Sequence, residues 1–201
     1  MKKVRTAVLV SGGGTNLQAI LDAERAGIIN SAEVALVVAD REGAYAIQRA
    51  EARGVKTAVL NFKELGRETF ESSLTALLDE NGIELIVLAG FMRILSAAFT
   101  SRYEGRILNI HPSLIPSFCG AGYYGLKVHE AALNYGVKVT GATVHFVNEV
   151  PDGGRIVAQK AVYIRPDDTP ESLQRRVMEE AEWIIFPEAI ESVAEDIRRL
   201  K

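Results

Sequence analysis

The sequence predicts a single Rossmann-like α/β domain over residues 1–201, with a mostly parallel central sheet, helices on both faces and antiparallel strands added in the C-terminal half. Three observations predict this fold. Short apolar, β-branched runs recur along the first half. Stretches with the spacing of amphipathic helices separate these runs, which is typical of a parallel sheet covered on both faces. The second half carries two longer strand candidates joined by a short glycine-rich connector.

The first half alternates strands with helices. The apolar runs predict strands at residues 4–10, 34–39, 57–60, 85–89 and 107–110. Apolar residues with helical spacing predict helices around residues 17–21, 46–50 and 70–78. Glycines follow these three helical stretches at positions 27, 54 and 82. Because a left-handed residue is favoured just after a helix, we expect these glycines to end the helices.

The second half predicts an antiparallel pair of strands, residues 138–147 and 155–164, because the connector 148–154 is short enough for a hairpin loop. A helix is expected over residues 127–135. Another is expected to begin at Pro170, with Thr169 as its N-cap. Pro187 is expected to kink or split this last helix and to leave a surface helix over residues 188–201.

Composition and charge disfavour several classes of function. The chain is 48% hydrophobic and 24% charged, which is ordinary for a globular protein, and its net charge of −3 argues against a nucleic-acid partner. The apolar stretch near the N-terminus is too short to span a membrane, so no membrane partner is expected. The single cysteine, Cys119, excludes an intramolecular disulfide, and the three histidines form no zinc-type pattern. We therefore expect a cytoplasmic protein with no metal.

A glycine-rich turn follows the first strand. The segment SGGGTN (residues 11–16) leads directly into a helix, so the amides of Gly14, Thr15 and Asn16 would point at an anion held at the helix N-terminus. Leu17 stands where a dinucleotide fingerprint needs its last glycine, and the Gly-Lys-Ser/Thr of a P-loop is also absent. The turn predicts a phosphate site, with a ligand-free β–α turn as the alternative.

The strand at residues 107–110 leads into a polar pair. Asn109 and His111 are two residues apart, so both side chains should point to one face, at the sheet edge where open α/β proteins bind ligands. Asn109 could donate to a developing oxyanion, and His111 could carry or donate a proton. Asp152, in the hairpin loop, would favour the imidazolium form of His111 if the two meet. A structural histidine and a common Asp-Gly turn are the alternatives.

Three further side chains are given no direct chemical role. His145, on the strand before the hairpin loop, is expected to be structural or to contact the site residues without touching the ligand. His129, on the helix at residues 127–135, is expected to be solvated at the surface. No Cys-His-Asn or Cys-His-Asp arrangement can be argued for Cys119, so we do not propose a nucleophile.

Taken in order, these motifs resemble those of the phosphoribosylglycinamide formyltransferases, and the resemblance covers nearly the whole chain. The motifs are SGGGTNLQ (residues 11–18), LAGFMRIL (88–95), LNIHPSL (108–114), TGATVHFV (140–147) and DGG (152–154). The resemblance implies transfer of a formyl group from the cosubstrate 10-formyltetrahydrofolate to the amine of glycinamide ribonucleotide, in de novo purine biosynthesis. It implies no metal, and a monomer or homodimer.

The resemblance also implies roles for single residues. Asn109, His111 and Asp152 would be the catalytic trio. The phosphate would bind at Gly14, Thr15 and Asn16, and the folate at Arg67, Met92, Arg93, Ile94, Leu95 and Asn109, beside the loop 148–154. Residues 1–105 would form the phosphate- and ribonucleotide-binding half, and residues 106–201 the catalytic and folate-binding half with the C-terminal helices.

Some positions depart from the usual family pattern or leave it ambiguous. The acidic contact to the ribose falls on Glu182 when counted back from Pro187, but on Ala181 when counted forward from Arg176. One apparent insertion separates the two counts. Arg155 stands where proline is common, and residues 116–122 replace a more proline-rich segment.

Other functions remain open. A formyltetrahydrofolate hydrolase would use the same trio with water as the acceptor, but usually carries an extra N-terminal domain. A tRNA-directed formyltransferase would need a basic surface and a C-terminal RNA-binding domain. The broken fingerprint disfavours a dinucleotide-dependent oxidoreductase. A non-catalytic nucleotide-binding module of the Rossmann type is the alternative from a different class.

Overall fold

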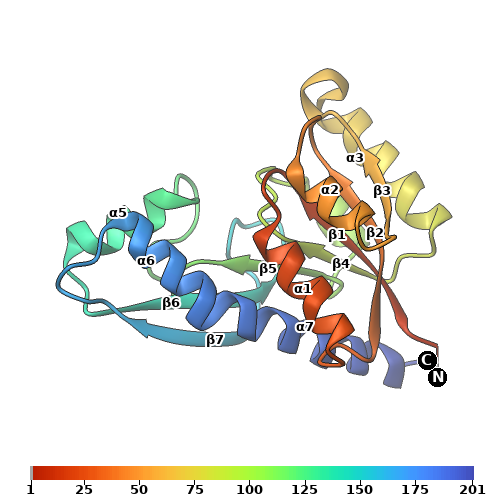
Figure 1. The fold of residues 1–201 in the computed structure, drawn as a ribbon. Coiled ribbons are helices and arrows are strands. Elements are labelled where there is room, and N and C mark those ends of the chain that lie inside the picture. Colours follow the sequence, from red (N-terminus) through yellow and green to blue (C-terminus); the bar gives the residue numbers. More distant parts are fainter. Residues whose placement is uncertain (1) are drawn as a thin grey trace.

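The computed structural model describes residues 2–201 and contains a seven-stranded sheet with the order β3-β2-β1-β4-β5-β6-β7. The strands β1 to β5 run parallel, and β6 and β7 join the β5 edge as antiparallel strands (Figure 1). This confirms the predicted fold class. The strands are β1 Val4–Val10, β2 Ala32–Ala39, β3 Lys56–Val59, β4 Leu85–Leu88, β5 Ile107–His111, β6 Val139–Phe146 and β7 Ile156–Tyr163.

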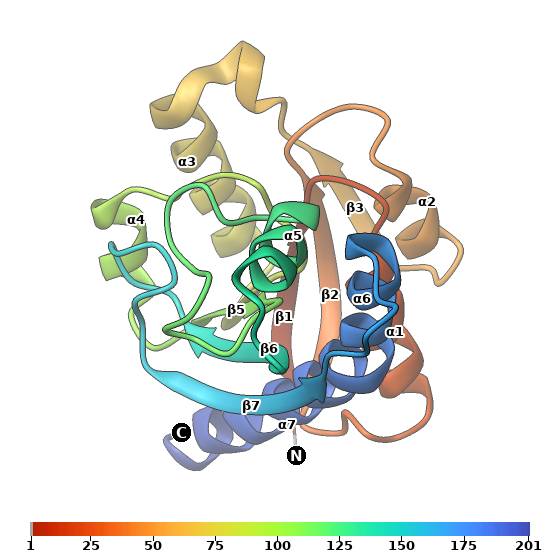
Figure 2. The ribbon, with the colours of Figure 1, turned by 90° about the vertical axis from the view of Figure 1, so that its left-hand side faces the viewer.

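Helices cover both faces of the sheet (Figure 2). They are α1 Thr15–Arg25, α2 Tyr45–Glu51, α3 Phe62–Glu80, α4 Ala97–Arg102, α5 Leu126–Tyr135, α6 Pro170–Val177, the π-helix η1 Met178–Glu182 and α7 Trp183–Arg199. The short helix α4 is absent from the sequence prediction. Its N-terminus is capped by Ser96, whose side chain accepts a hydrogen bond from the amide of Phe99.

The near-continuous apolar runs of the parallel strands serve two cores at once. In β1, Val8 and Val10 pack with α1, α2 and α7, whereas Ala7 and Leu9 pack with α3 and α4. Because successive side chains of a strand point to opposite faces, a strand covered on both sides must be apolar at nearly every position. The same alternation decides which side chains of β5 face the functional site.

The ends of the elements follow local chemistry. Gly27, Gly54 and Gly82 have φ values of 74°, 70° and 58°, in the left-handed region, as expected after a helix. Thr169 caps α6, and its hydroxyl accepts from the amide of Ser172 in a reciprocal capping box. No helix within residues 2–201 has both the length and the hydropathy that a membrane span requires.

The expected break at Pro187 is wrong. Helix α7 continues through Pro187, and the irregular segment is the π-helix η1, which ends at Glu182. Proline removes one hydrogen bond inside α7, whereas the π-helix lies before α7 and widens the turn by one residue. The helix is not merely a surface helix either, because Ile190 and Val193 on one of its faces are buried in the core.

Candidate active site

Strand β5 presents its two polar side chains on one face of the sheet. Leu108 and Ile110 point into the core formed with α1 and α7, so Asn109 and His111 share the opposite face with Ile107. His111 is the last residue of β5, and its residue exposure is only 5%. The prediction that the two side chains lie on the same face is confirmed.

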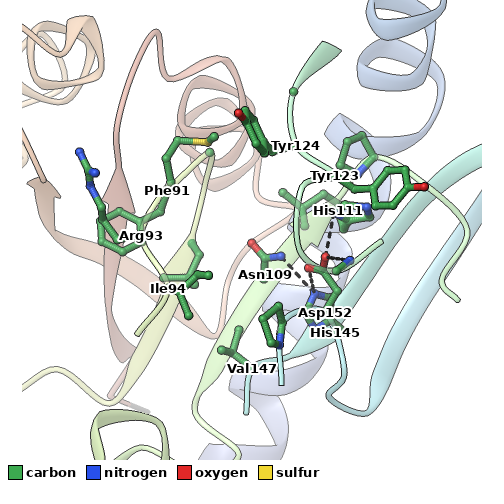
Figure 3. A pocket seen from close by; sticks show the side chains of 18 of the residues that line it. Phe91, Arg93, Ile94, Asn109, His111, Tyr123, Tyr124, His145, Val147 and Asp152 are labelled. Atoms are coloured by element: carbon green, nitrogen blue, oxygen red, sulfur yellow. Dashed lines mark hydrogen bonds and ion pairs between the residues drawn. The ribbon is translucent and has the colours of Figure 1, made fainter. Parts of the chain in front are cut away.

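Asp152 and a second histidine complete a cluster with this pair (Figure 3). Nδ1 of His111 lies 3.5 Å from Oδ2 of Asp152, and Nε2 of His145 lies 3.5 Å from Oδ1 of the same carboxylate. Nδ2 of Asn109 lies 3.1 Å from Nε2 of His145. His145 therefore joins Asn109 to Asp152. The sequence could not show this contact, because it depends on the antiparallel register that sets His145 opposite Asn109.

The conformation of the hairpin loop directs the Asp152 carboxylate toward the two histidines. Asp152 has a left-handed backbone with φ 56°, and the amide of Gly120 donates to its Oδ2 at 2.8 Å. A Cβ on Gly154 would overlap the carbonyl oxygen of Phe146, so the loop needs glycine there. Burial raises the pKa of Asp152, but hydrogen bonds from His145 and Gly120 and the positive charge of nearby imidazoles outweigh it and lower the pKa overall. The carboxylate form is favoured.

His111 also makes a second contact. Its Nε2 lies 2.9 Å from the carbonyl oxygen of Phe118, which can only accept a hydrogen bond, so Nε2 carries the hydrogen. Phe118 has φ 49°, a left-handed conformation that is uncommon for an aromatic residue. The segment 118–120 thus contacts both His111 and Asp152 through its backbone. A ligand atom that is to reach Nε2 of His111 must replace this carbonyl.

These residues border a cavity of about 730 Å³. Its walls come from β4 and the loop after it, the end of β5, the segment 120–125, the loop 147–152 and η1. The loop after β4 contributes Met92, Arg93, Ile94 and Leu95, which the family resemblance assigns to the folate. Arg67, assigned to the same ligand, is exposed on α3 just beyond a kink at Gly66, away from this lining.

Asp40 and Phe62 hold Arg93 in place. Nε of Arg93 donates to Oδ2 of Asp40, a carboxylate that is fully buried at the end of β2. The guanidinium also lies over the ring of Phe62, 4.8 Å from its centroid. The sequence offered no signal for this ion pair, because an aspartate after a strand is common in turns.

The glycine-rich turn reaches the cavity through Asn16. Helix α1 begins at Thr15, and no side chain caps it, so its first amides are open to a ligand. Gly14 has φ 71°, and a Cβ there would lie 2.6 Å from the Cβ of Ala46. Glycine at position 14 is therefore required by the packing against α2, whether or not an anion binds.

Glu182 lies at the same end of the cavity. Its Oε2 accepts a hydrogen bond from Nδ2 of Asn16 at 2.7 Å, and its exposure is 6%. Burial raises the pKa of Glu182 to about 6, although the hydrogen bond from Asn16 opposes the shift. A π-helix accommodates one extra residue relative to an α-helix, which accounts for the two conflicting counts. Glu182 lines the cavity, whereas Ala181 is buried in the core.

The expectation that His129 is solvated is wrong. It is 1% exposed and lines the cavity, because α5 turns Val128, His129 and Ala132 inward. Burial and the nearby charge of His111 lower the pKa of His129 to about 4. Cys119, by contrast, was assigned no chemistry. Burial and the negative charge of Asp152 raise the pKa of its thiol, which disfavours the reactive thiolate.

The cluster contains no metal-type donor set. Within residues 2–201, no group of three or more histidine, cysteine or acidic side chains is arranged to hold a metal ion. An amide, an imidazole and a carboxylate beside an open helix N-terminus can instead bind an anionic molecule and stabilise charge on an oxygen. The fold and the site thus define an α/β protein that binds small molecules at the carboxyl edge of its sheet.

Comparison with known proteins gives the family. A family model described as formyl transferase matches residues 4–190. The phosphoribosylglycinamide formyltransferase of Haemophilus influenzae is 42% identical over 202 residues, which cover 100% of this chain and 91% of that protein. The crystal structure of glycinamide ribonucleotide transformylase 1 from Symbiobacterium toebii superposes with a TM-score of 0.89 at 44% identity, covering 96% of this chain and 89% of that one. The chain belongs to the formyl transferase family, among its phosphoribosylglycinamide formyltransferases, which confirms the resemblance.

Some relatives are much longer. The trifunctional purine biosynthetic protein adenosine-3 of Gallus gallus is 47% identical over 193 residues, which cover 96% of this chain but 18% of that protein. The human protein of the same name is 45% identical and is likewise covered over 18% of its length. The chain thus spans about a fifth of these trifunctional relatives and matches one segment of each.

Proposed function

We propose that the protein transfers a formyl group from 10-formyltetrahydrofolate to the amine of glycinamide ribonucleotide, giving formylglycinamide ribonucleotide and tetrahydrofolate. The observation that carries this proposal is the meeting of Asn109, His111 and Asp152 on one side of a cavity that also reaches the open N-terminus of α1. The names of the full-length relatives support it. With it goes the expectation of a cytoplasmic monomer or homodimer.

The proposed reaction is a direct transfer. The free amine of the ribonucleotide attacks the formyl carbon, and the C=O electron pair moves onto oxygen. The amide of Asn109 and Nε2–H of His111 stabilise this oxyanion once the carbonyl of Phe118 has withdrawn. Collapse of the intermediate breaks the bond to the folate nitrogen, which takes up the proton that the amine loses through a water beside Asp152. No covalent bond to the enzyme forms.

The two substrates are proposed to enter from opposite ends of the cavity. The phosphate would bind the amides of Gly14, Thr15 and Asn16, and the ribose would lie against Glu182. The folate would lie between residues 92–95 and the loop 148–152, both of which line the cavity. Arg67 is exposed on α3, so its side chain would have to turn inward to reach the folate. Holding both substrates together supplies much of the remaining rate.

A deformylation assay tests the proposal. The protein is mixed with 10-formyltetrahydrofolate, with and without glycinamide ribonucleotide, and tetrahydrofolate is followed. Turnover that requires the ribonucleotide supports the transferase. Equal turnover without it indicates the hydrolase, and no turnover in either case indicates a non-catalytic module.

The same assay tests the trio. We expect Asn109→Ala to lower kcat by ~10² without loss of fold, because one oxyanion donor disappears. A kcat within a few-fold of the wild type would remove Asn109 from the mechanism.

A further inference from the structure

His129 is a buried polar residue of the cavity that the proposed reaction leaves unused. It lies on α5, is 1% exposed and lines the cavity. Neither of its ring nitrogens has a hydrogen-bond partner among residues 2–201. Buried polar groups in native proteins are almost always hydrogen-bonded, so an unpaired ring beside a binding cavity points to a partner that enters with the ligand.

The other two histidines of the chain differ in this respect. His111 has Asp152 at Nδ1 and the carbonyl of Phe118 at Nε2. His145 donates from Nδ1 to the carbonyl of Phe146 and has Asn109 at Nε2. Within residues 2–201, His129 is therefore the imidazole whose two nitrogens both lack a hydrogen-bond partner.

The charge state of His129 limits what that group can be. With a pKa near 4, the ring is neutral at physiological pH, so one nitrogen donates a hydrogen bond and the other accepts one. A neutral ring gives no ionic attraction to a phosphate. It suits a ligand group that itself carries both an N–H donor and an acceptor, such as an amine next to an amide.

We propose that His129 binds the glycinamide end of the ribonucleotide by hydrogen bonds and orients its amine toward the formyl carbon. The inference rests on the proposed function and adds a substrate-binding residue to it. His129 belongs to the reacting end of the cavity because it lines the same cavity as Asn109 and His111, and a charge on His111 is close enough to lower its pKa. The phosphate is assigned to the turn at residues 14–16.

The main test is His129→Phe, which keeps a planar ring and removes both nitrogens. The KM for the ribonucleotide should rise about tenfold, the equivalent of one lost hydrogen bond, while the KM for the folate stays constant. The Tm should not fall, because the ring nitrogens have no hydrogen bond to lose and phenylalanine keeps a packed planar ring. Tyr135→Phe is the matched control on the same helix: Tyr135 is 81% exposed, and this change should leave both KM values unaltered.

A spectroscopic measurement gives an answer independent of activity. In protein labelled with ¹⁵N-histidine, the ring signals that vanish in His129→Phe belong to His129. Adding ribonucleotide without folate should shift these signals while they keep the pattern of a neutral ring. His129→Gln, which retains a donor and an acceptor, should recover part of the lost affinity.

Two results would overturn the inference. One is an unchanged ribonucleotide KM in a stably folded His129→Phe protein. The other is a similar rise in both KM values together with a lower Tm, which would make His129 structural. If His129→Phe does not fold, His129→Gln assigns the ring signals instead, and signals that do not shift when ribonucleotide is added overturn the inference. Failure of the proposed function looks different, because the wild-type protein would then show no turnover that depends on the ribonucleotide.

Discussion

Asp152 is the residue on which the cluster depends. Its two oxygens face His111 from β5 and His145 from β6, and one of them also accepts the amide of Gly120. Asp152 is only 14% exposed in its side chain, so its charge interacts with the two imidazoles with little screening by solvent. The hydrogen bonds that lower its pKa also join the hairpin loop to His145 of β6 and to Gly120 in the segment before α5.

Asp152→Asn tests whether this charge acts on His111. An ordinary imidazole loses its proton near pH 6.5, and a neighbouring carboxylate favours the protonated form. We therefore expect kcat to fall by ~10² at pH 8 and by less at pH 6, because a carboxylate that favours an imidazolium has its largest effect where free imidazole is mostly neutral. The measurement is a pH–rate profile of variant and wild type, with folding checked by circular dichroism. A drop of equal size at every pH would instead mean that Asp152 positions a water or the folate.

Burial raises the pKa of Glu182 by more than its hydrogen bond from Asn16 lowers it, which is the reverse of the balance at Asp152. The Glu182 pKa of about 6 in the folded state, against the ordinary 4.5, means that the unfolded chain releases this proton first. The contribution of Glu182 to the free energy of unfolding is greatest below pH 4.5 and is lost as pH rises through 6. Above that pH the buried charge costs about 2 kcal/mol.

Glu182→Gln should therefore stabilise the ligand-free protein by about 2 kcal/mol at pH 7.5 and by little at pH 4.5. The glutamine can still accept the hydrogen bond from Asn16. The free energy of unfolding in urea, measured at both pH values, checks this. The same variant should raise the KM for the ribonucleotide, because the ribose loses a charged acceptor. An equal stability change at both pH values would show that the carboxylate is not strained by burial.

Among the elements, η1 sets the register of the C-terminal helices. It carries one residue more than a regular turn, and Glu180 within it is exposed. Deleting Glu180 should restore a regular helix while α6 and α7 keep their packing, so the Tm should change by only a few degrees. The KM for the ribonucleotide should rise, because Met178 and Glu182 change their relative orientation.

Deleting Glu188 is the control for this change. Glu188 is exposed in the regular part of α7, and its loss would turn the rest of the helix by about 100°, taking Ile190 and Val193 out of the core. We expect this control to lower the Tm strongly or to prevent folding. If the two deletions are equally harmful, η1 is not an inserted residue in an otherwise regular helix.

The elements also show where prediction from the sequence succeeds. The strands follow from apolar runs, because burial on both faces leaves a local signal. The helix α4 has six residues and too few turns to leave a periodic pattern. Pro187 gave the wrong position for the helix irregularity, because the extra residue of η1 lies in a segment with no proline or glycine to mark it.

The candidate site likewise contains residues that local sequence places correctly and residues that only the tertiary structure places. The spacing of Asn109 and His111 was sufficient to place them together, because both lie on one strand. The contact of His145 with Asn109 required the strand register, and the burial of His129 required the packing of α5. The choice between Ala181 and Glu182 required the π-helix. The exposed position of Arg67 could not be foreseen, because a motif match gives no direction for a side chain.

At the scale of the whole molecule, the cavity lies where the parallel part of the sheet meets the antiparallel part. The lining joins Asn16 and residues 88–95 from the first half to β5, β6, their loops and η1 from the second. The division at residue 105 into two binding halves stays a prediction, and the cavity draws on both sides of it. Helices α5 and α6 lie side by side (Figure 1), and they contribute His129 and Gln174 to the cavity lining.

This arrangement predicts different responses to the two substrates in hydrogen exchange. Each ligand at 100 times its Kd should add about 2.7 kcal/mol to stability, and the exchange of the loops it touches should slow most. The ribonucleotide should protect residues 12–16 and 178–182. The folate should protect residues 91–95 and 148–152, and either should change the segment 118–120 when the carbonyl of Phe118 leaves His111. Strands β1 and β4, already buried on both faces, should exchange as slowly as before.

Mass spectrometry of peptide fragments resolves these segments. If both ligands protect the same segments apart from 118–120, the two substrates do not occupy separate ends of the cavity. The arrangement proposed for direct transfer between them would then be wrong.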